Sequence, residues 1–262
     1  MNLPSSDALT PVPSGSLTIA PLSTNFLKLS LVIPTYNEGE NIQAIIKSLS
    51  ESLDRAIWGA YELIVVDDDS SDQTWQLALD LLSQYPQLRV MRRTQEKGLS
   101  TAVIRGWQVA RGEILGVIDA DLQHPPLVLL KLIANIEAGA DLAVASRHLQ
   151  GGGFGQWNWF RRFLSKGAQI LGLLILPEVL SRLSDPMSGY FLVRRSAIAG
   201  IKMSPIGYKI LIEVTARGRI RKIAEAGYIF QERHAGVSKV TWRQYLEYLQ
   251  HLSKLRAAKG VR

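Results

Sequence analysis

The feature that most constrains the fold of this chain is a regular alternation of short apolar runs with segments of helical periodicity. The runs are rich in Val, Ile and Leu and nearly continuous in apolar character, as in strands buried on both faces. Between them, apolar residues recur at helical spacing, as at Ile42, Ile45, Ile46 and Leu49. The pattern predicts an α/β fold with a mainly parallel, Rossmann-like sheet and helices on both faces. The expected strands are 29–33, 63–66, 89–92, 114–118 and 142–145, and the expected helices are 40–53, 74–82, 98–110 and 126–138.

The two ends of the chain differ in character from this alternating core. Residues 1–28 hold four prolines among Ser and Thr and carry no basic residue before Lys28, which predicts a disordered tail and no secretory signal. A single domain is expected over residues 29–240, followed by an amphipathic basic helix over 241–262. The longest uncharged apolar stretch, 167–177, is far below the roughly 20 residues that a membrane-spanning helix needs. Any contact with a membrane is therefore expected to be peripheral.

Polar residues gather where three of the expected strands end. These segments are 34–38, 67–69 and 119–123. Because ligands of open parallel sheets bind beyond the carboxyl ends of the strands, the three segments predict one shared site. No GxGxxG motif follows the first strand, which disfavours a dinucleotide-binding fold.

Two carboxylates, Asp119 and Asp121, stand two residues apart after the strand 114–118. Held close together they would repel each other, and a bound divalent cation would relieve the repulsion and bridge to the oxygens of a diphosphate. The chain has no cysteine, so a metal must use oxygen or imidazole ligands. The alternative is a pair of solvated turn acids. His124 is either a further ligand or a residue at a helix start before two prolines.

The other two strand ends carry candidates for binding a nucleoside. Asp68 could accept hydrogen bonds from a base edge or a ribose, whereas Ser71 and Asp72 are better explained as caps of the following helix. Tyr36 could stack on a base and Glu38 could bond its edge, and the alternative for both is a turn and helix start.

The chain carries a formal charge of +7 and has a sequence pI near 9.7, which indicates either a basic surface or a phosphate-bearing partner. Arg147 follows the strand 142–145 at the acidic edge, and a glycine-containing loop carries Arg233 and Lys239. These cations could hold a substrate phosphate, or they could be solvated surface charges. A nucleic-acid partner is disfavoured, because no binding motif is recognisable and the acids would repel a phosphate backbone.

Two segments have an amphipathic pattern. In 159–174, Arg161 and Ser165 are four residues apart and could hold one phosphate together, or they could lie on a solvated face. The segment 241–256 predicts a helix that packs on the core or lies at a membrane interface. Its expected apolar stripe is Trp242, Tyr245, Leu246, Leu249 and Leu252.

Eight short motifs follow one another along the chain in an order that is typical of one protein family. They are VIPTYNE (32–38), VVDDDS (65–70), KGLSTA (97–102), DADLQHP (119–125), ASR (145–147), SKGA (165–168), DPMSGYF (185–191) and GYK (207–209). On these motifs the chain resembles the dolichyl-phosphate (polyprenyl-phosphate) mannose synthases of glycosyltransferase family 2, over about residues 29–249.

The resemblance implies a GT-A fold and an inverting transfer of mannose from GDP-mannose to dolichyl or polyprenyl phosphate, which gives a β-linked lipid phosphomannose. It implies a Mg²⁺ or Mn²⁺ cofactor and an enzyme that lies on the cytoplasmic face of a membrane, with a small membrane-anchoring protein as a further partner. The alternatives are a polyprenyl-phosphate glucosyltransferase that uses UDP-glucose, and a non-catalytic protein that binds nucleotide or lipid.

The resemblance also implies roles for individual residues. The catalytic residues are Asp119, Asp121 and Arg147, and the metal ligands are Asp119, Asp121 and Gln123. The nucleotide-sugar site comprises Pro34, Tyr36, Glu38, Val66, Asp68, Asp119, Ala120, Asp121, Gln123, Lys209, Arg233 and Lys239. The acceptor phosphate is held by Arg147, Arg161, Ser165, Ser188, Arg233 and Lys239, and Gly189 lies in the same stretch as Ser188.

Overall fold

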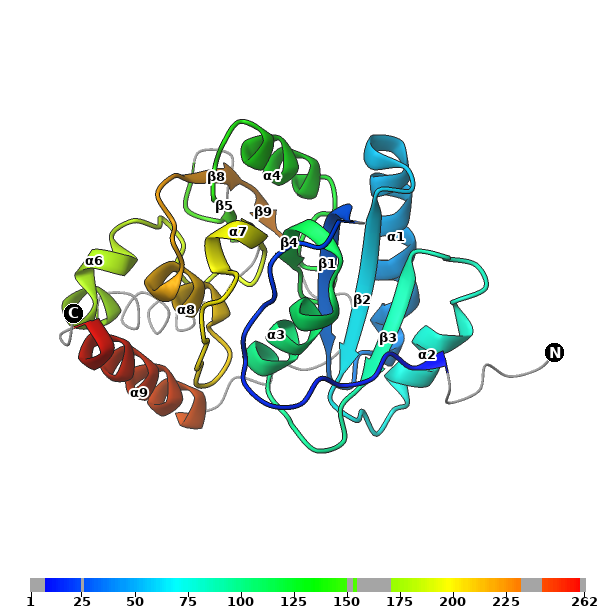
Figure 1. Cartoon of the computed structure of the whole chain (residues 1–262), viewed down its shortest axis with the longest axis horizontal. Helices are drawn as coiled ribbons and strands as arrows, with labels where there is room; N and C mark the ends of the chain where they lie inside the picture. Colours follow the sequence, from blue (N-terminus) through cyan, green and yellow to red (C-terminus); the bar gives the residue numbers. More distant parts are fainter. Residues whose placement is uncertain (1–7, 25, 150–152, 155–170, 232–241, 260–262) are drawn as a thin grey trace.

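In the computed structural model, the fold is built on one seven-stranded sheet. Helices flank this sheet (Figure 1). The structure describes residues 8–24, 26–149, 153–154, 171–231 and 242–259. The strand order is β3-β2-β1-β4-β7-β5-β8, and every strand is parallel to its neighbours except β7, which is antiparallel to both β4 and β5. The strands are β1 (Leu27–Thr35), β2 (Tyr61–Asp67), β3 (Leu88–Arg92), β4 (Gly112–Val117), β5 (Leu142–Ser146), β7 (Phe191–Arg194) and β8 (Ile223–Gly227).

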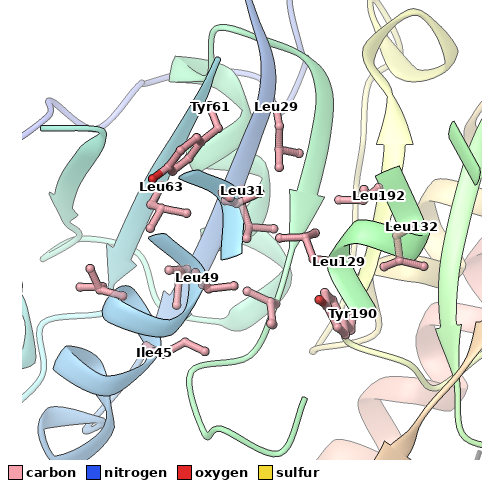
Figure 2. Packing of buried hydrophobic residues seen from close by; sticks show 14 of the residues in the cluster. Leu29, Leu31, Ile45, Leu49, Tyr61, Leu63, Leu129, Leu132, Tyr190 and Leu192 are labelled. Carbon is pink, nitrogen blue, oxygen red and sulfur yellow. The ribbon is translucent and has the colours of Figure 1, made fainter. Parts of the chain in front are cut away.

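The helices cover both faces of this sheet, as predicted. Alternate residues of β1 point to opposite sides, so Leu31 joins one buried cluster and Val32 joins another. Figure 2 shows the first cluster, in which Leu31 lies among side chains of the helices Gly39–Ile57 and Val128–Glu137. The helices are α1 (Gly39–Ile57), α2 (Thr74–Asp80), α3 (Leu99–Val109), α4 (Val128–Glu137), α6 (Pro177–Leu180), α7 (Arg195–Ile198), α8 (Ile210–Arg217) and α9 (Trp242–Lys259). A two-stranded parallel sheet joins β6 (Gly153–Phe154) to β9 (Ile229–Phe230).

The five strands and four helices predicted up to residue 145 are all present, with ends shifted by a few residues. The pattern gave no indication of β7, a strand of only four residues that lies between a turn and a short helix. Its insertion between β4 and β5 matters for the site, because it brings the residues before it to the carboxyl edge of the sheet.

The prediction of a disordered tail over 1–28 is wrong for residues 8–24, which we call the N-terminal strap. The strap crosses the sheet from β3 to α7, with the Thr10 amide donating to Val90 O at 2.7 Å and the Gly200 amide donating to Ile19 O at 2.9 Å (Figure 1). Ile19 is completely buried. Proline and serine content indicated an absence of internal structure, but these residues obtain their hydrogen bonds and burial from the rest of the domain. Residues 1–7 lie outside the described residues.

The C-terminal helix is present as α9, but the expected stripe is wrong in part. The buried apolar side chains are Tyr248, Leu252 and Leu255, which pack with residues of α6 and α8. Of the expected stripe, Leu252 is buried and Leu249 packs against this cluster, whereas Leu246 is 48% exposed. The spacing of apolar residues in α9 allows two overlapping apolar stripes. The position of α8 determines which of the two is buried. Within the described residues, no helix is long and apolar enough to cross a bilayer.

We expect Ile19→Ala to lower the free energy of unfolding by about 2–5 kcal/mol, the usual range for emptying a buried aliphatic site. The control is Leu22→Ala in the same strap, because Leu22 is 36% exposed and has less contact area to lose. Urea unfolding followed by circular dichroism measures both. Equal stabilities of the Ile19 variant and the wild type would show that the strap does not dock in solution.

Candidate active site

The carboxyl ends of β1 and β2 are held together by Asp67. Its carboxylate accepts hydrogen bonds from the Thr35 hydroxyl at 2.7 Å, from the Ser70 hydroxyl at 2.6 Å and from the Ser70 amide at 2.8 Å. Burial raises the pKa of Asp67 above its usual range, although these hydrogen bonds oppose the shift. The Asp67 carboxylate therefore holds the ends of β1 and β2 in place.

Asp68 lies beside it and has a partner that no sequence signal predicted. The guanidinium of Arg93 binds Asp68 Oδ1 through Nε at 2.7 Å and also through Nη2, and the Gly98 amide donates to Oδ2 at 2.6 Å. Arg93 itself is completely buried and also donates to Thr101 Oγ1 at 3.0 Å. These contacts fix the carboxylate in one orientation at the sheet edge. The expected hydrogen bond from a nucleoside to Asp68 stays a prediction.

The neighbouring residues give a mixed outcome for the capping predictions. Gln73, and not Asp72, occupies the cap position of α2, but Asp72 Oδ1 accepts the amide of Thr74, the first residue of that helix, at 3.0 Å. Ser71 does not cap that helix, and instead donates through its amide and hydroxyl to Asn37 Oδ1, at 3.0 and 3.1 Å. Glu38 stands at the start of α1 and accepts the Asn41 side-chain amide at 2.9 Å.

The other predicted nucleoside residues lie at the same strand ends. Pro34 and Val66 are paired across β1 and β2 and are buried. Tyr36 is 43% exposed, with the Lys97 ammonium 5.5 Å from its ring centroid. An exposed ring beside a cation at this edge is suited to stacking on a base, which remains untested.

The acidic motif follows β4 in the middle of the sheet. Asp119 is 32% exposed at its side chain, whereas Ala120 and Asp121 are buried. Gly189 packs directly on Asp119, because a Cβ added at position 189 would lie 2.5 Å from Asp119 Oδ2. Gln123 donates from its side-chain amide to Gln231 O at 3.0 Å, which leaves the Gln123 carbonyl oxygen as its ligand atom.

His124 does not begin a helix, because α4 starts only at Val128. Its ring is buried among the rings of Tyr190, Tyr228 and Phe230, with centroid distances of 5.3 to 5.4 Å. The Nε2 atom lies 3.5 Å from Asp119 Oδ2. His124 is therefore a buried neighbour of Asp119, and the three aromatic rings hold it in that place.

The cationic part of the site is built around a buried ion pair. Arg147 follows β5 and binds Asp185 with two hydrogen bonds, from Nε at 2.7 Å and from Nη2 at 2.8 Å. Burial alone would raise the pKa of Asp185, but the hydrogen bonds and charge of Arg147 outweigh it and lower that pKa. The sequence alone does not identify Asp185 as a site residue, because it lies 38 positions from Arg147 and no local pattern indicates that the two residues pair.

Lys209 completes the described cations at this edge. Its ammonium donates to Met187 O at 3.2 Å and lies 4.2 Å from the ring centroid of Tyr208. Burial lowers the pKa of Lys209 to about 8, the positive charge of Arg147 contributes, and the nearby charges of Asp185 and Asp119 oppose the shift. The structure thus brings Lys209, Arg147 and Asp119 into one electrostatically coupled group.

The remaining predicted acceptor residues are less informative. Ser188 is buried, and its hydroxyl accepts the Tyr190 amide at 3.2 Å within the turn before β7. Its expected contact with a phosphate is untested. Arg161, Ser165, Arg233 and Lys239 lie outside the described residues.

The chemistry of the acidic motif fits a hard divalent cation that arrives with a diphosphate. Among the described residues, no group of three His, Asp or Glu side chains is placed to hold a metal alone. Asp119, Asp121 and the carbonyl of Gln123 offer oxygen ligands of the type that Mg²⁺ and Mn²⁺ prefer. A partial ligand set of this kind is normal where substrate phosphates supply the remaining oxygens.

The fold and site define a class of protein, the GT-A glycosyltransferases. The structure of glucosyl-3-phosphoglycerate synthase from Mycobacterium tuberculosis, solved with Mn²⁺, UDP-glucose and phosphoglyceric acid, superposes with a TM-score of 0.67. The match covers 89% of this chain and 80% of that chain at 24% sequence identity, so it establishes the shared fold.

The chain belongs to glycosyl transferase family 2, whose model matches residues 30–201. It is 44% identical to dolichol-phosphate mannosyltransferase of Pyrococcus furiosus over 89% of this chain, and it spans 65% of that relative's length. It is 35% identical to polyprenol monophosphomannose synthase of Mycolicibacterium smegmatis, over 80% of each chain. The resemblance seen in the sequence motifs is thereby confirmed.

We expect Gly189→Ala to keep the fold and to weaken metal-dependent activity roughly 10–100-fold, the usual cost of disturbing the support of a metal ligand. The added methyl group would push aside the Asp119 carboxylate, a partly exposed side chain that can move. Metal titration of sugar transfer, with thermal unfolding alongside, measures the two effects. Wild-type metal dependence in a folded variant would contradict this account of Gly189.

Proposed function

We propose that this protein transfers mannose from GDP-mannose to a polyprenyl or dolichyl phosphate. The proposal is supported above all by the meeting of two unlike groups at one sheet edge. These are carboxylates suited to a metal diphosphate, and the buried Arg147 with the partly buried Lys209, which are suited to a phosphate. Relatives that align with 80–89% of this chain, at 35% and 44% identity, are named polyprenol monophosphomannose synthase and dolichol-phosphate mannosyltransferase.

In this proposal the donor lies along the ends of β1, β2 and β4. Tyr36 would stack on the base, and Asp68, held by Arg93, would accept a hydrogen bond from the nucleoside. Asp119, Asp121 and Gln123 would hold Mg²⁺ or Mn²⁺, which when bound would neutralise the charge on the leaving nucleotide diphosphate.

Arg147 and Lys209 would hold phosphate oxygens beside this donor, and we propose the same role for Arg233 and Lys239, which lie outside the described residues. Asp185 fixes the Arg147 guanidinium in a single orientation. The division of these cations between the phosphates of the donor and the acceptor is part of the proposal.

A strong general base is unnecessary, because a phosphate monoester with a second pKa near about 6 is largely dianionic at neutral pH. A phosphate oxygen of the lipid forms a bond to the anomeric carbon as the bond from that carbon to the diphosphate oxygen breaks. One displacement inverts the configuration, so an α-linked donor gives a β-linked lipid phosphosugar. The side chains contribute by positioning and by electrostatic stabilisation.

We place the reaction on the cytoplasmic face of a membrane, with a small membrane-anchoring protein as a further partner. The support is the chemistry of the acceptor, a lipid whose phosphate must reach the sheet edge from a membrane surface. Leu174 and Leu246 are exposed, and the Arg256 guanidinium lies beside the backbone oxygen of Leu174, which is compatible with such a surface.

We expect incubation with GDP-mannose, Mg²⁺ or Mn²⁺ and polyprenyl phosphate in detergent to give a polyprenyl phosphomannose, identified by mass spectrometry. The matched control is Asp121→Ala, which should lower transfer by roughly 10²–10³-fold by removing a group that supports the developing charge. Product from UDP-glucose but not from GDP-mannose would establish the glucosyltransferase instead. A lack of product with every donor would favour a binding protein.

We also expect kcat/KM for the donor to fall as the pH rises through about 8, because Lys209 then loses its positive charge. Below that pH the ammonium is charged and available to a phosphate. Lys209→Arg should move this alkaline limb upward, since a guanidinium keeps its charge. An alkaline limb at the same pH in the Lys209→Arg variant would mean that another group is responsible.

A further inference from the structure

Lys209 depends on other parts of the chain for its position, because the residues before it form no helix or strand. Residues 203–209, which we call the Lys209 loop, connect the segment after α7 to the start of α8. The loop makes its turn at Gly207, whose φ of +72° is a conformation that favours glycine. The contacts that hold this loop therefore decide where the ammonium lies.

Several of these contacts come from α9, which is distant in the sequence. Glu247, His251 and Lys254 stand at positions i, i+4 and i+7 of α9 and so share one face, which we call the polar stripe. Lys254 Nζ donates to Ser204 Oγ at 2.6 Å and to Ser204 O at 3.1 Å. Glu247 packs against Gly207, where an added Cβ would lie 3.2 Å from Oε2.

His251 acts on the same loop through Glu213 of α8. The His251 Nε2 atom lies 2.7 Å from Glu213 Oε2, and both side chains are completely buried. The other oxygen, Oε1, accepts the Ser204 amide and the Arg217 Nε, the latter at 2.6 Å. Glu213 therefore joins α9 and the Lys209 loop through its two oxygens.

The surroundings of Glu213 favour its charged form. Burial alone would raise the pKa of Glu213, but hydrogen bonds from His251 and Ser204 and the charge of Arg217 outweigh it and lower that pKa. The Nδ1 atom of His251 is buried without a partner among the described residues, so the contact of Nε2 with Glu213 is what fixes the ring.

We propose that the polar stripe of α9 positions Lys209 for the donor, with His251 as its central positioning residue. The inference rests on the proposed function, in which Lys209 holds a phosphate. Docking of α9 by itself does not require these contacts, because Tyr248, Leu252 and Leu255 already supply a buried apolar stripe. A buried polar pair adds little net stability in place of apolar side chains, but it can fix one arrangement of the elements that it joins.

The experiment compares His251→Leu, His251→Gln and Lys254→Met with the wild type. Gln250→Leu is the matched control, because Gln250 is exposed on the same helix and the substitution makes a similar change from polar to apolar. Donor KM, acceptor KM, kcat and the alkaline pKa of kcat/KM are measured, with thermal unfolding alongside. Binding of GDP with Mg²⁺ is followed by calorimetry.

We expect His251→Leu to raise the donor KM between roughly 10-fold and 100-fold, the effect of a misplacement of about 1 Å, with little change in the acceptor KM. Its alkaline limb should move upward, because Lys209 would be freed from the burial that lowers its pKa among Arg147, Asp185, Asp119 and Tyr208. His251→Gln, which retains a donor at the position of Nε2, should recover most of the affinity. Lys254→Met should change the same quantities in the same direction, but less.

A wild-type donor KM and alkaline limb in folded variants would overturn the inference, as would equal rises in the donor and acceptor KM. If His251→Leu does not fold, the donor KM values of His251→Gln and Lys254→Met are compared with that of the wild type. A wild-type donor KM in both variants would then overturn the inference. GDP binding separates this inference from the proposed function. If GDP binding weakens in His251→Leu but the wild type transfers sugar from no donor, the positioning role is supported and the proposed mannosyltransferase is contradicted. A wild type that does not bind GDP would contradict both.

Discussion

The buried ion pair between Arg147 and Asp185 is the interaction on which the architecture of the site depends. Arg147 follows β5 and Asp185 precedes β7, the antiparallel strand that separates β5 from β4. A guanidinium buried in this position would be costly without a carboxylate, so the two segments must meet for the fold to form. Once they meet, Gly189 is carried onto the carboxylate of Asp119, and the acids and cations share one edge.

The same principle recurs across the sheet, and it separates supporting charges from those that face a substrate. Asp68 is held by Arg93, and Glu213 is held by His251 and Arg217. Such partners lower the pKa of Asp185 and of Glu213 despite burial. Lys209 differs, because burial and the cation Arg147 lower its pKa, and a bound phosphate would stabilise its charged form. A cation whose pKa is lowered by its surroundings in this way is characteristic of a functional site.

The sequence predicted those parts of the structure that depend on local pattern. Apolar runs and helical periods gave the strands and helices up to residue 145, and acids after those strands located the carboxyl edge. Pattern failed where the partner was distant. The composition of the N-terminal strap is typical of a disordered tail, but hydrogen bonds to distant elements such as β3 hold it in place. The stripe that α9 buries includes the expected Leu252 but not Leu246, because α8 determines which face is covered.

By itself, then, the sequence determined the fold class, the family and the identity of the acidic motif. Strand burial, helical spacing and motif order are all local patterns that can be recognised without knowing which distant residues meet. Only the tertiary structure decided which carboxylates support the site and which are available to a ligand. The pairs Asp68–Arg93, Asp185–Arg147 and Glu213–His251 join residues 25 to 38 positions apart, and no local pattern specifies such a contact. Charge and burial at the site are therefore properties of the assembled sheet edge.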